Sequence, residues 1–114
     1  MRFIMASIAL LLAATGSLLA QGKGIRFWNL TSSTVTRLQL APAGTQSFGP
    51  DQCQNDPDGV VDHDERLRLV GVAPGRYDVK LADKTGRVCM VRNLAIEDDK
   101  VFSITDADLT DCGH

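Results

Sequence analysis

Short segments in which apolar and polar residues alternate, with turn residues between them, constrain the fold of this chain more than any other feature. The clearest is Arg76–Leu81, where every second side chain is apolar. Because successive side chains of a β-strand point to opposite faces of a sheet, this spacing predicts a strand with one buried face. Residues 73–75 and 83–86 on either side contain the Pro, Gly and Asp typical of turns.

Five further segments contain strand-forming residues: Ile25–Leu30, Thr34–Leu40, Glu65–Val70, Arg87–Leu94 and Lys100–Ile104. Only a short polar turn separates the first two, so they are expected to form a hairpin. Thr105 stands as an N-cap with Asp108 at the third helical position, which predicts a short helical turn near the C-terminus. About six short strands and no long helical period predict an all-β fold, a small antiparallel β-sandwich.

The first 20 residues have the layout of an export signal. Fifteen of them are apolar, Arg2 supplies a basic start, and small residues precede Ala20. The apolar run from Ile8 to Ala14 is too short for a membrane span of about 20 residues. We therefore expect a signal peptide at 1–20 and one domain at 21–114, exported to the periplasm or the extracellular medium and without a membrane span.

An exported chain places its three cysteines in an oxidising compartment. Cys53, Cys89 and Cys112 then give one disulfide and one remaining thiol. A bond between Cys89 and Cys112 is favoured because it ties the C-terminal tail to a strand, although the pairing of Cys53 with either partner stays open. A catalytic role for Cys53 lacks support, since His63 is the only candidate base and nearby acids raise the pKa of a thiol.

The long segment from Ala41 to Asp64 is predicted to be one loop, and it leads into an acidic stretch. Residues 51–65 hold six acids and no Lys or Arg. In the register of a calcium-binding EF-hand loop, with Gly59 at the sixth place, the ligand positions fall on Gln54, Asp56, Asp58, the Val60 carbonyl, Asp62 and Glu65. This spacing predicts a calcium site. Gln at the first position and the lack of flanking helices depart from the pattern, and a solvated acidic turn is the alternative.

Other metals and nucleic acid are weaker possibilities. His63, His114 and Cys53 lack the close spacing of a zinc or copper site. Residues 21–114 hold 11 Lys and Arg against 14 Asp and Glu, which disfavours nucleic-acid binding. Basic side chains between residues 66 and 92 are expected on the solvent face of one sheet, as antiparallel sheets commonly show.

Trp28 is a candidate ligand contact. It follows Phe27 directly, so one of the two aromatic side chains faces outward in a regular strand. An exposed Trp stacks well on a sugar ring. No Gly-x-Ser-x-Gly or His-Glu-x-x-His motif occurs in the sequence, so no enzyme is predicted.

These observations predict a small exported, non-catalytic binding or structural module with calcium in its acidic loop and no other cofactor. The alternatives are an envelope protein-interaction module without metal, and a sugar-binding module that uses Trp28. The expected partner is an envelope protein or a polysaccharide.

Several motifs also resemble a group of short exported proteobacterial proteins of uncharacterised function. They are Ser47–Asp51, Pro74–Val79, Asp83, Gly86, Cys89, Ile104–Leu109 and Cys112. The resemblance covers nearly all of 21–114. It implies a β-sandwich, the Cys89–Cys112 bond and a periplasmic location, and it brings no activity with it.

Overall fold

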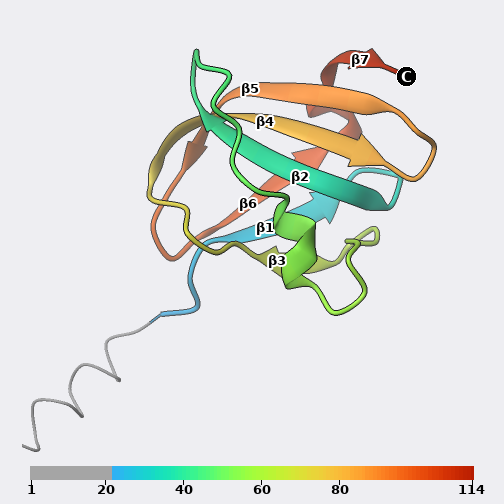
Figure 1. The fold of residues 1–114 in the computed structure, drawn as a ribbon. Coiled ribbons are helices and arrows are strands. Elements are labelled where there is room, and N and C mark those ends of the chain that lie inside the picture. Colours follow the sequence, from blue (N-terminus) through green and yellow to red (C-terminus); the bar gives the residue numbers. More distant parts are fainter. Residues whose placement is uncertain (1–21) are drawn as a thin grey trace, which may run out of the picture.

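The computed structural model describes residues 22–114, and the predicted export signal lies outside them. The described part is built from two packed sheets (Figure 1). Its elements are β1 (Arg26–Leu30), β2 (Val35–Pro42), η1 (Gln52–Asn55), β3 (Arg66–Arg68), β4 (Gly75–Asp83), β5 (Val88–Ile96), β6 (Val101–Thr105), η2 (Asp106–Asp108) and β7 (Thr110–Gly113). Both η elements are short 3-10 turns.

The larger sheet has the order β2-β4-β5-β7 and is antiparallel throughout. The smaller sheet has the order β3-β1-β6, in which β1 pairs antiparallel with β3 and parallel with β6. The predicted all-β sandwich is confirmed. The parallel β1–β6 pair and the seventh strand at the C-terminus are additions to the expected arrangement.

The predicted hairpin between the first two strands is wrong, because β1 and β2 belong to different sheets. The buried side chain of Asn29 holds the crossing segment. Its amide donates to the carbonyl oxygens of Ser33 and Val61, and its Oδ1 accepts hydrogen bonds from the N–H and hydroxyl of Thr31. The Asn29 side chain therefore has partners for its amide and for its carbonyl oxygen, as a buried amide requires. The polar residues that resemble a hairpin turn instead carry the chain from one sheet to the other.

The core lies between the two sheets. It is formed by the side chains that point inward, roughly every second residue along each strand. Phe27 and Phe102 of the smaller sheet pack with their ring centroids 5.6 Å apart. Leu38 and Leu81 of the larger sheet are fully buried. Val79 is buried as well, so the alternation at residues 76–81 correctly predicted which face of β4 points into the core. Asp78 on the other face is also buried, and its carboxylate accepts the Gly44 N–H.

The C-terminal segment folds back onto the larger sheet. The N–H and hydroxyl of Thr105 donate to the Asp108 carboxylate at 2.8 and 3.0 Å, and the predicted helical turn forms there as η2. Strand β7 then pairs with β5, and Cys112 forms the disulfide with Cys89. Cys53 is the remaining free cysteine and is buried. No helix within residues 22–114 is long and apolar enough to cross a membrane.

Candidate functional site

The outer face of the smaller sheet gathers three arginines and the tryptophan. Arg26 and Trp28 alternate with buried residues along β1, and Arg66 and Arg68 flank a buried leucine on β3. The strand register places Arg26 opposite Arg68 and Trp28 opposite Arg66. Residues opposite each other in a sheet share a face. We call this surface, made of Arg26, Trp28, Arg66 and Arg68, the Arg–Trp face.

Trp28 is held in place by two contacts. The Arg66 guanidinium carbon lies 4.0 Å from the Trp28 ring centroid, a cation–π arrangement. The indole Nε1 donates to Asp64 Oδ1 at 3.0 Å. The ring is half-buried and Arg66 is exposed. The Arg66 guanidinium therefore covers one face of the Trp28 indole, and it is the group of this pair that is exposed to solvent.

The side chains of Arg26 and Arg68 both lie close to Gly24. Arg26 donates from Nε to the Gly24 carbonyl at 3.1 Å and from Nη2 to the Asp99 carbonyl at 3.2 Å. Gly24 has a φ of 78°, and a Cβ there would lie 3.2 Å from Arg68 Nε. Glycine thus provides the left-handed backbone and the space that let Arg68 approach the chain.

The arginines of this face have no acidic partner in the part of the chain that the structure describes. The ion pairs formed there belong to Arg87, Arg92 and Lys100. Like charges directly opposite each other across two strands destabilise a sheet. An anion bound between the guanidiniums would offset that repulsion, because guanidinium donors match carboxylate and phosphate oxygens.

The basic side chains expected on one sheet are divided between two. Arg66 and Arg68 lie on β3 in the smaller sheet, whereas Arg76, Lys80 and Arg92 lie on β4 and β5 in the larger one. Arg26 lies outside residues 66–92, for which the basic face was predicted. Its alternation with Trp28 indicates a common face on β1, but only the pairing of β1 with β3 brings it beside Arg68.

In the acidic loop, the predicted calcium ligands make local hydrogen bonds. Asp56 Oδ1 accepts the Asp58 N–H at 2.8 Å, and Glu65 Oε1 accepts the Asp62 N–H at 2.9 Å. Asp62 Oδ1 accepts the Thr34 hydroxyl at 2.9 Å. The first two contacts form turns within the loop, a common role of acidic side chains in turns, whereas the third ties the loop to the segment between β1 and β2.

The first predicted ligand lies in η1. Gln54 Nε2 donates to Asp51 Oδ2 at 3.3 Å, and Asp51 caps η1 through the Cys53 N–H. Val60 is half-buried and precedes Val61, which bridges to Val35 of β2. Asp51 Oδ1 also accepts the N–H of Leu38 in β2 at 3.0 Å, so this bond and the Val35–Val61 bridge attach both ends of the loop to the edge of the larger sheet.

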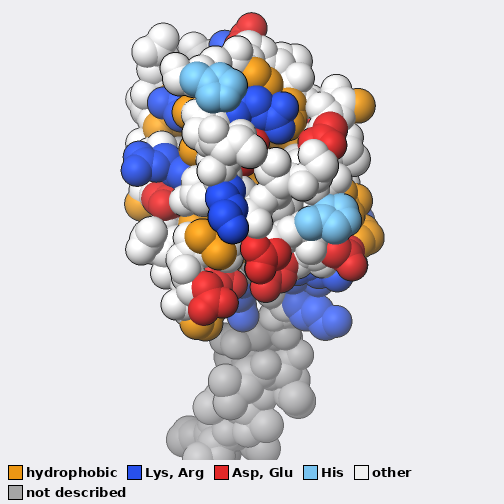
Figure 2. All heavy atoms as spheres, turned by 90° about the vertical axis from the view of Figure 1, so that its right-hand side faces the viewer, with side chains coloured by type: hydrophobic (Ala, Val, Ile, Leu, Met, Phe, Trp, Pro, Cys, Tyr) orange, Lys and Arg blue, Asp and Glu red, His pale blue; other side chains and the backbone are white. Residues whose placement is uncertain are grey.

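Among residues 22–114, no group of three or more His, Cys, Asp or Glu side chains is placed to hold a metal ion. Figure 2 shows acidic side chains in separate groups on the face it presents, with basic and uncharged atoms between them. Calcium binding therefore stays a prediction, and it requires the carboxylates to move together when the ion binds.

The candidate nucleophile and base are each engaged elsewhere. Cys53 is fully buried, and its thiol points to the Val35 carbonyl with Sγ and O 3.8 Å apart. Burial, followed by the charge of Asp51, raises the pKa of Cys53 to about 12. His63 Nδ1 lies 2.7 Å from the Thr31 carbonyl oxygen, to which it donates. A thiol that is buried and protonated is a poor nucleophile and a poor metal ligand.

Comparison of the chain with protein-family models, with curated proteins and with solved structures found no match in any of the three.

Proposed function

We propose that this protein is an exported, non-catalytic binding module that holds an acidic polysaccharide on its Arg–Trp face. The observation that carries the proposal is the placement of Arg26, Arg66 and Arg68 on one sheet face, with no carboxylate paired to any of them in residues 22–114. Such an arrangement costs stability in the free protein and gains from a polyanion.

The geometry suits an extended ligand with repeated carboxylates. Arg66 and Arg68 are two residues apart on one strand, a Cα separation of roughly 6.6 Å, and Arg26 lies on the neighbouring strand roughly 5 Å away. The three charges are thus spread over a surface and are not focused on one point. A chain of uronate sugars presents charges over a comparable area, whereas one small anion contacts only part of it.

Trp28 acts in this proposal as a positioning residue. Its ring supports the Arg66 guanidinium from one side, and Asp64 fixes the ring through Nε1. A guanidinium already held in place loses less conformational entropy when it binds a carboxylate. The sugar-binding alternative expected for Trp28 is retained in this form, with the arginines making the polar contacts.

The cysteines support export and a non-nucleophilic role for Cys53. The Cys89–Cys112 disulfide is the kind of bond that forms and persists in oxidising compartments, which favours the periplasm or the extracellular medium. The remaining thiol, Cys53, is buried with a raised pKa, which favours a structural over a nucleophilic role.

Calorimetry with polygalacturonate tests the proposal. The chain is titrated in EDTA, so that calcium bound to the polymer does not contribute, at low and at high salt. We expect binding that weakens as salt rises, and that falls about tenfold or more in the Arg66→Gln/Arg68→Gln variant, because two charge-assisted contacts are lost. Dextran, a neutral polymer, is expected not to bind.

The matched control for the single variant Arg68→Gln is Arg37→Gln, which also removes one charge, from an exposed position on β2. If Arg37→Gln weakens binding as much as Arg68→Gln, attraction is a property of overall charge and the proposed site is wrong. Equal binding of dextran and polygalacturonate contradicts the proposed ligand class.

A further inference from the structure

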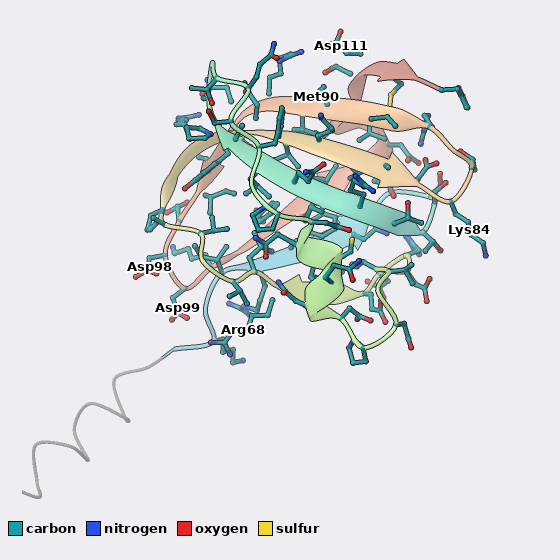
Figure 3. All side chains as sticks on the ribbon, viewed as in Figure 1. Arg68, Lys84, Met90, Asp98, Asp99 and Asp111 are labelled. Atoms are coloured by element: carbon teal, nitrogen blue, oxygen red, sulfur yellow. A yellow bond between two sulfur atoms is a disulfide. The ribbon has the colours of Figure 1, made fainter. Side chains whose placement is uncertain are left out.

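A groove lies on the opposite side of the sandwich, over the outer face of the larger sheet. Its volume is about 220 Å³, and it is lined by Thr45, Gln46, Phe48, Lys80, Met90 and Arg92. In Figure 3 the labelled Met90 lies on the upper sheet with Asp111 beyond it, whereas Arg68 of the Arg–Trp face projects from the lower part of the molecule. The groove is therefore separate from the surface described above.

One wall of the groove is a loop, residues 43–50, that is fixed to the sheet by hydrogen bonds. The Gly44 N–H donates to the buried carboxylate of Asp78 at 3.0 Å. The Gly49 N–H donates to the Leu40 carbonyl at 2.9 Å, and Gln39 Nε2 donates to the Gly49 carbonyl at 3.1 Å. Because the loop is tied at both ends, the groove is formed before any ligand binds, which lowers the entropy cost of binding.

The two cations of the groove differ in what they have available for a ligand. Arg92 donates from Nε and Nη2 to Asp111 Oδ2, at 3.2 and 3.1 Å, and its Nη1 lies 3.9 Å from Asp78. Lys80 Nζ instead lies 4.3 Å from the centroid of the Phe48 ring, and no carboxylate in residues 22–114 pairs with it. The unpaired ammonium stands beside an aromatic ring and the Met90 thioether.

We propose that this groove binds a small carboxylate with an apolar body, the carboxylate at Lys80 and the apolar part against Phe48 and Met90. A single free cation suits one negative charge, and the Asp111 carboxylate at Arg92 disfavours a second. The groove volume of about 220 Å³ lies below the roughly 300 to 1,000 Å³ of pockets for drug-sized ligands, which suits a smaller ligand such as phenylacetate.

Apolar contact and charge are separable in the experiment. Phenylacetate and phenylacetamide share one shape and differ in charge, so they are titrated in parallel into the full chain carrying ¹³C-labelled methionine methyl groups. The Met90 signal is assigned by its loss in Met90→Leu. We expect a saturable shift of this signal with phenylacetate, and affinity about five- to tenfold lower for phenylacetamide, since a charge-assisted contact is lost.

Variants of the lysine test the site itself. Lys80→Gln is expected to weaken phenylacetate binding about five- to tenfold, and Lys80→Arg is expected to retain it, because arginine keeps the charge and stacks on Phe48. Lys84→Gln is the matched control, since it removes a lysine from the exposed β4–β5 turn and is expected to change nothing.

Any one of three outcomes overturns the inference. The first is equal affinity for phenylacetate and phenylacetamide, and the second is equal weakening of phenylacetate binding in the Lys80→Gln and Lys84→Gln variants. The third is a Met90 signal that does not shift at any phenylacetate concentration tested. Unchanged binding of phenylacetate by Arg66→Gln/Arg68→Gln is expected in any case. The groove and the Arg–Trp face are therefore tested independently.

Discussion

Arg26 and Arg68 lie directly opposite each other on the antiparallel strands β1 and β3, and neither is paired with a carboxylate in residues 22–114. Cross-strand pairs of like charge are unfavourable in a sheet, and opposite charges at such positions are stabilising. The fold accounts for Arg26, whose guanidinium donates to the carbonyl oxygens of Gly24 and Asp99. We propose that a bound anion accounts for Arg68, which stands opposite a like charge.

Replacement of Arg68 by Gln is expected to stabilise the fold while it weakens ligand binding. Removing the repulsion from Arg26 raises the free energy of unfolding by about 0.2 to 1 kcal/mol at low salt. The gain disappears at high salt because the repulsion is screened. Urea unfolding at two salt concentrations measures both effects, and a loss of stability at low salt contradicts the functional explanation of this pair.

The disulfide between Cys89 and Cys112 is expected to supply a large part of the stability. Closing a loop of about 24 residues contributes roughly 3 kcal/mol in the loop-entropy description. Reduction with dithiothreitol should therefore lower the free energy of urea unfolding by about that amount. The Cys89→Ala/Cys112→Ala variant should unfold identically with and without dithiothreitol. A response to the reductant in that variant would mean that Cys53 forms a disulfide with a second molecule.

Cys53 is expected to react with iodoacetamide only when the protein unfolds. Its side chain is fully buried, and its pKa is raised to about 12, chiefly by that burial. At pH 8 the native thiol is both shielded and protonated, so mass spectrometry should find no adduct until urea is added. Rapid labelling of the native protein would show that the segment around η1 opens locally.

Local rules account for the parts of the fold that the sequence predicts well. The strict alternation at residues 76–81 identifies the buried face of β4, because strand geometry alone determines it. The Thr105 and Asp108 pair defines η2 for the same reason, since a cap depends on neighbours three residues apart. The pairing of Cys89 with Cys112 was also predicted from local features, since Cys89 lies in a predicted strand and Cys112 in the C-terminal tail.

Long-range pairing accounts for what the sequence does not predict. Residues 25–30 and 34–40 look like a hairpin, but the buried amide of Asn29 bonds to Val61 across 32 residues and carries β1 into the other sheet. The Arg–Trp face depends on the register between β1 and β3, some 40 residues apart, which no local pattern encodes. Carboxylate spacing in the acidic loop likewise does not specify where the side chains point.

The Asp58→Ala variant tests the calcium prediction without removing a hydrogen bond of the loop. Asp58 is exposed, and its contact in the loop is made by its backbone N–H, so Asp58→Ala leaves the hydrogen bond to Asp56 in place. If calcium binds, millimolar calcium raises the melting temperature of the wild type and not that of Asp58→Ala. Glu65→Ala is expected to behave alike but from a lower starting temperature, because Glu65 accepts the Asp62 N–H. An identical melting curve with EDTA and with calcium rejects the site.

The carboxylate of Asp83 is expected to make stability fall in acid. Burial raises the pKa of this group, but hydrogen bonds from Thr85 and Arg87 outweigh it, and the pKa lies below the usual value of 3.8. A carboxyl with a lower pKa in the folded state adds stability above its unfolded pKa, and that stability is lost as pH falls through the folded value.

Urea unfolding between pH 7 and pH 2 measures the contribution of Asp83. At pH 7, Asp83→Asn is expected to lower the free energy of unfolding by about 1 to 3 kcal/mol, because the charged partner of Arg87 in the β4–β5 turn is lost. Below about pH 4 the difference from the wild type should shrink gradually, since the carboxyl of the unfolded chain takes up its proton first and that of the folded chain follows as pH falls through its lower pKa. Asp58→Asn, an exposed acid elsewhere, is the control and should leave the acid profile unchanged. A constant difference across the whole range would mean that Asp83 acts through its shape and not through its charge.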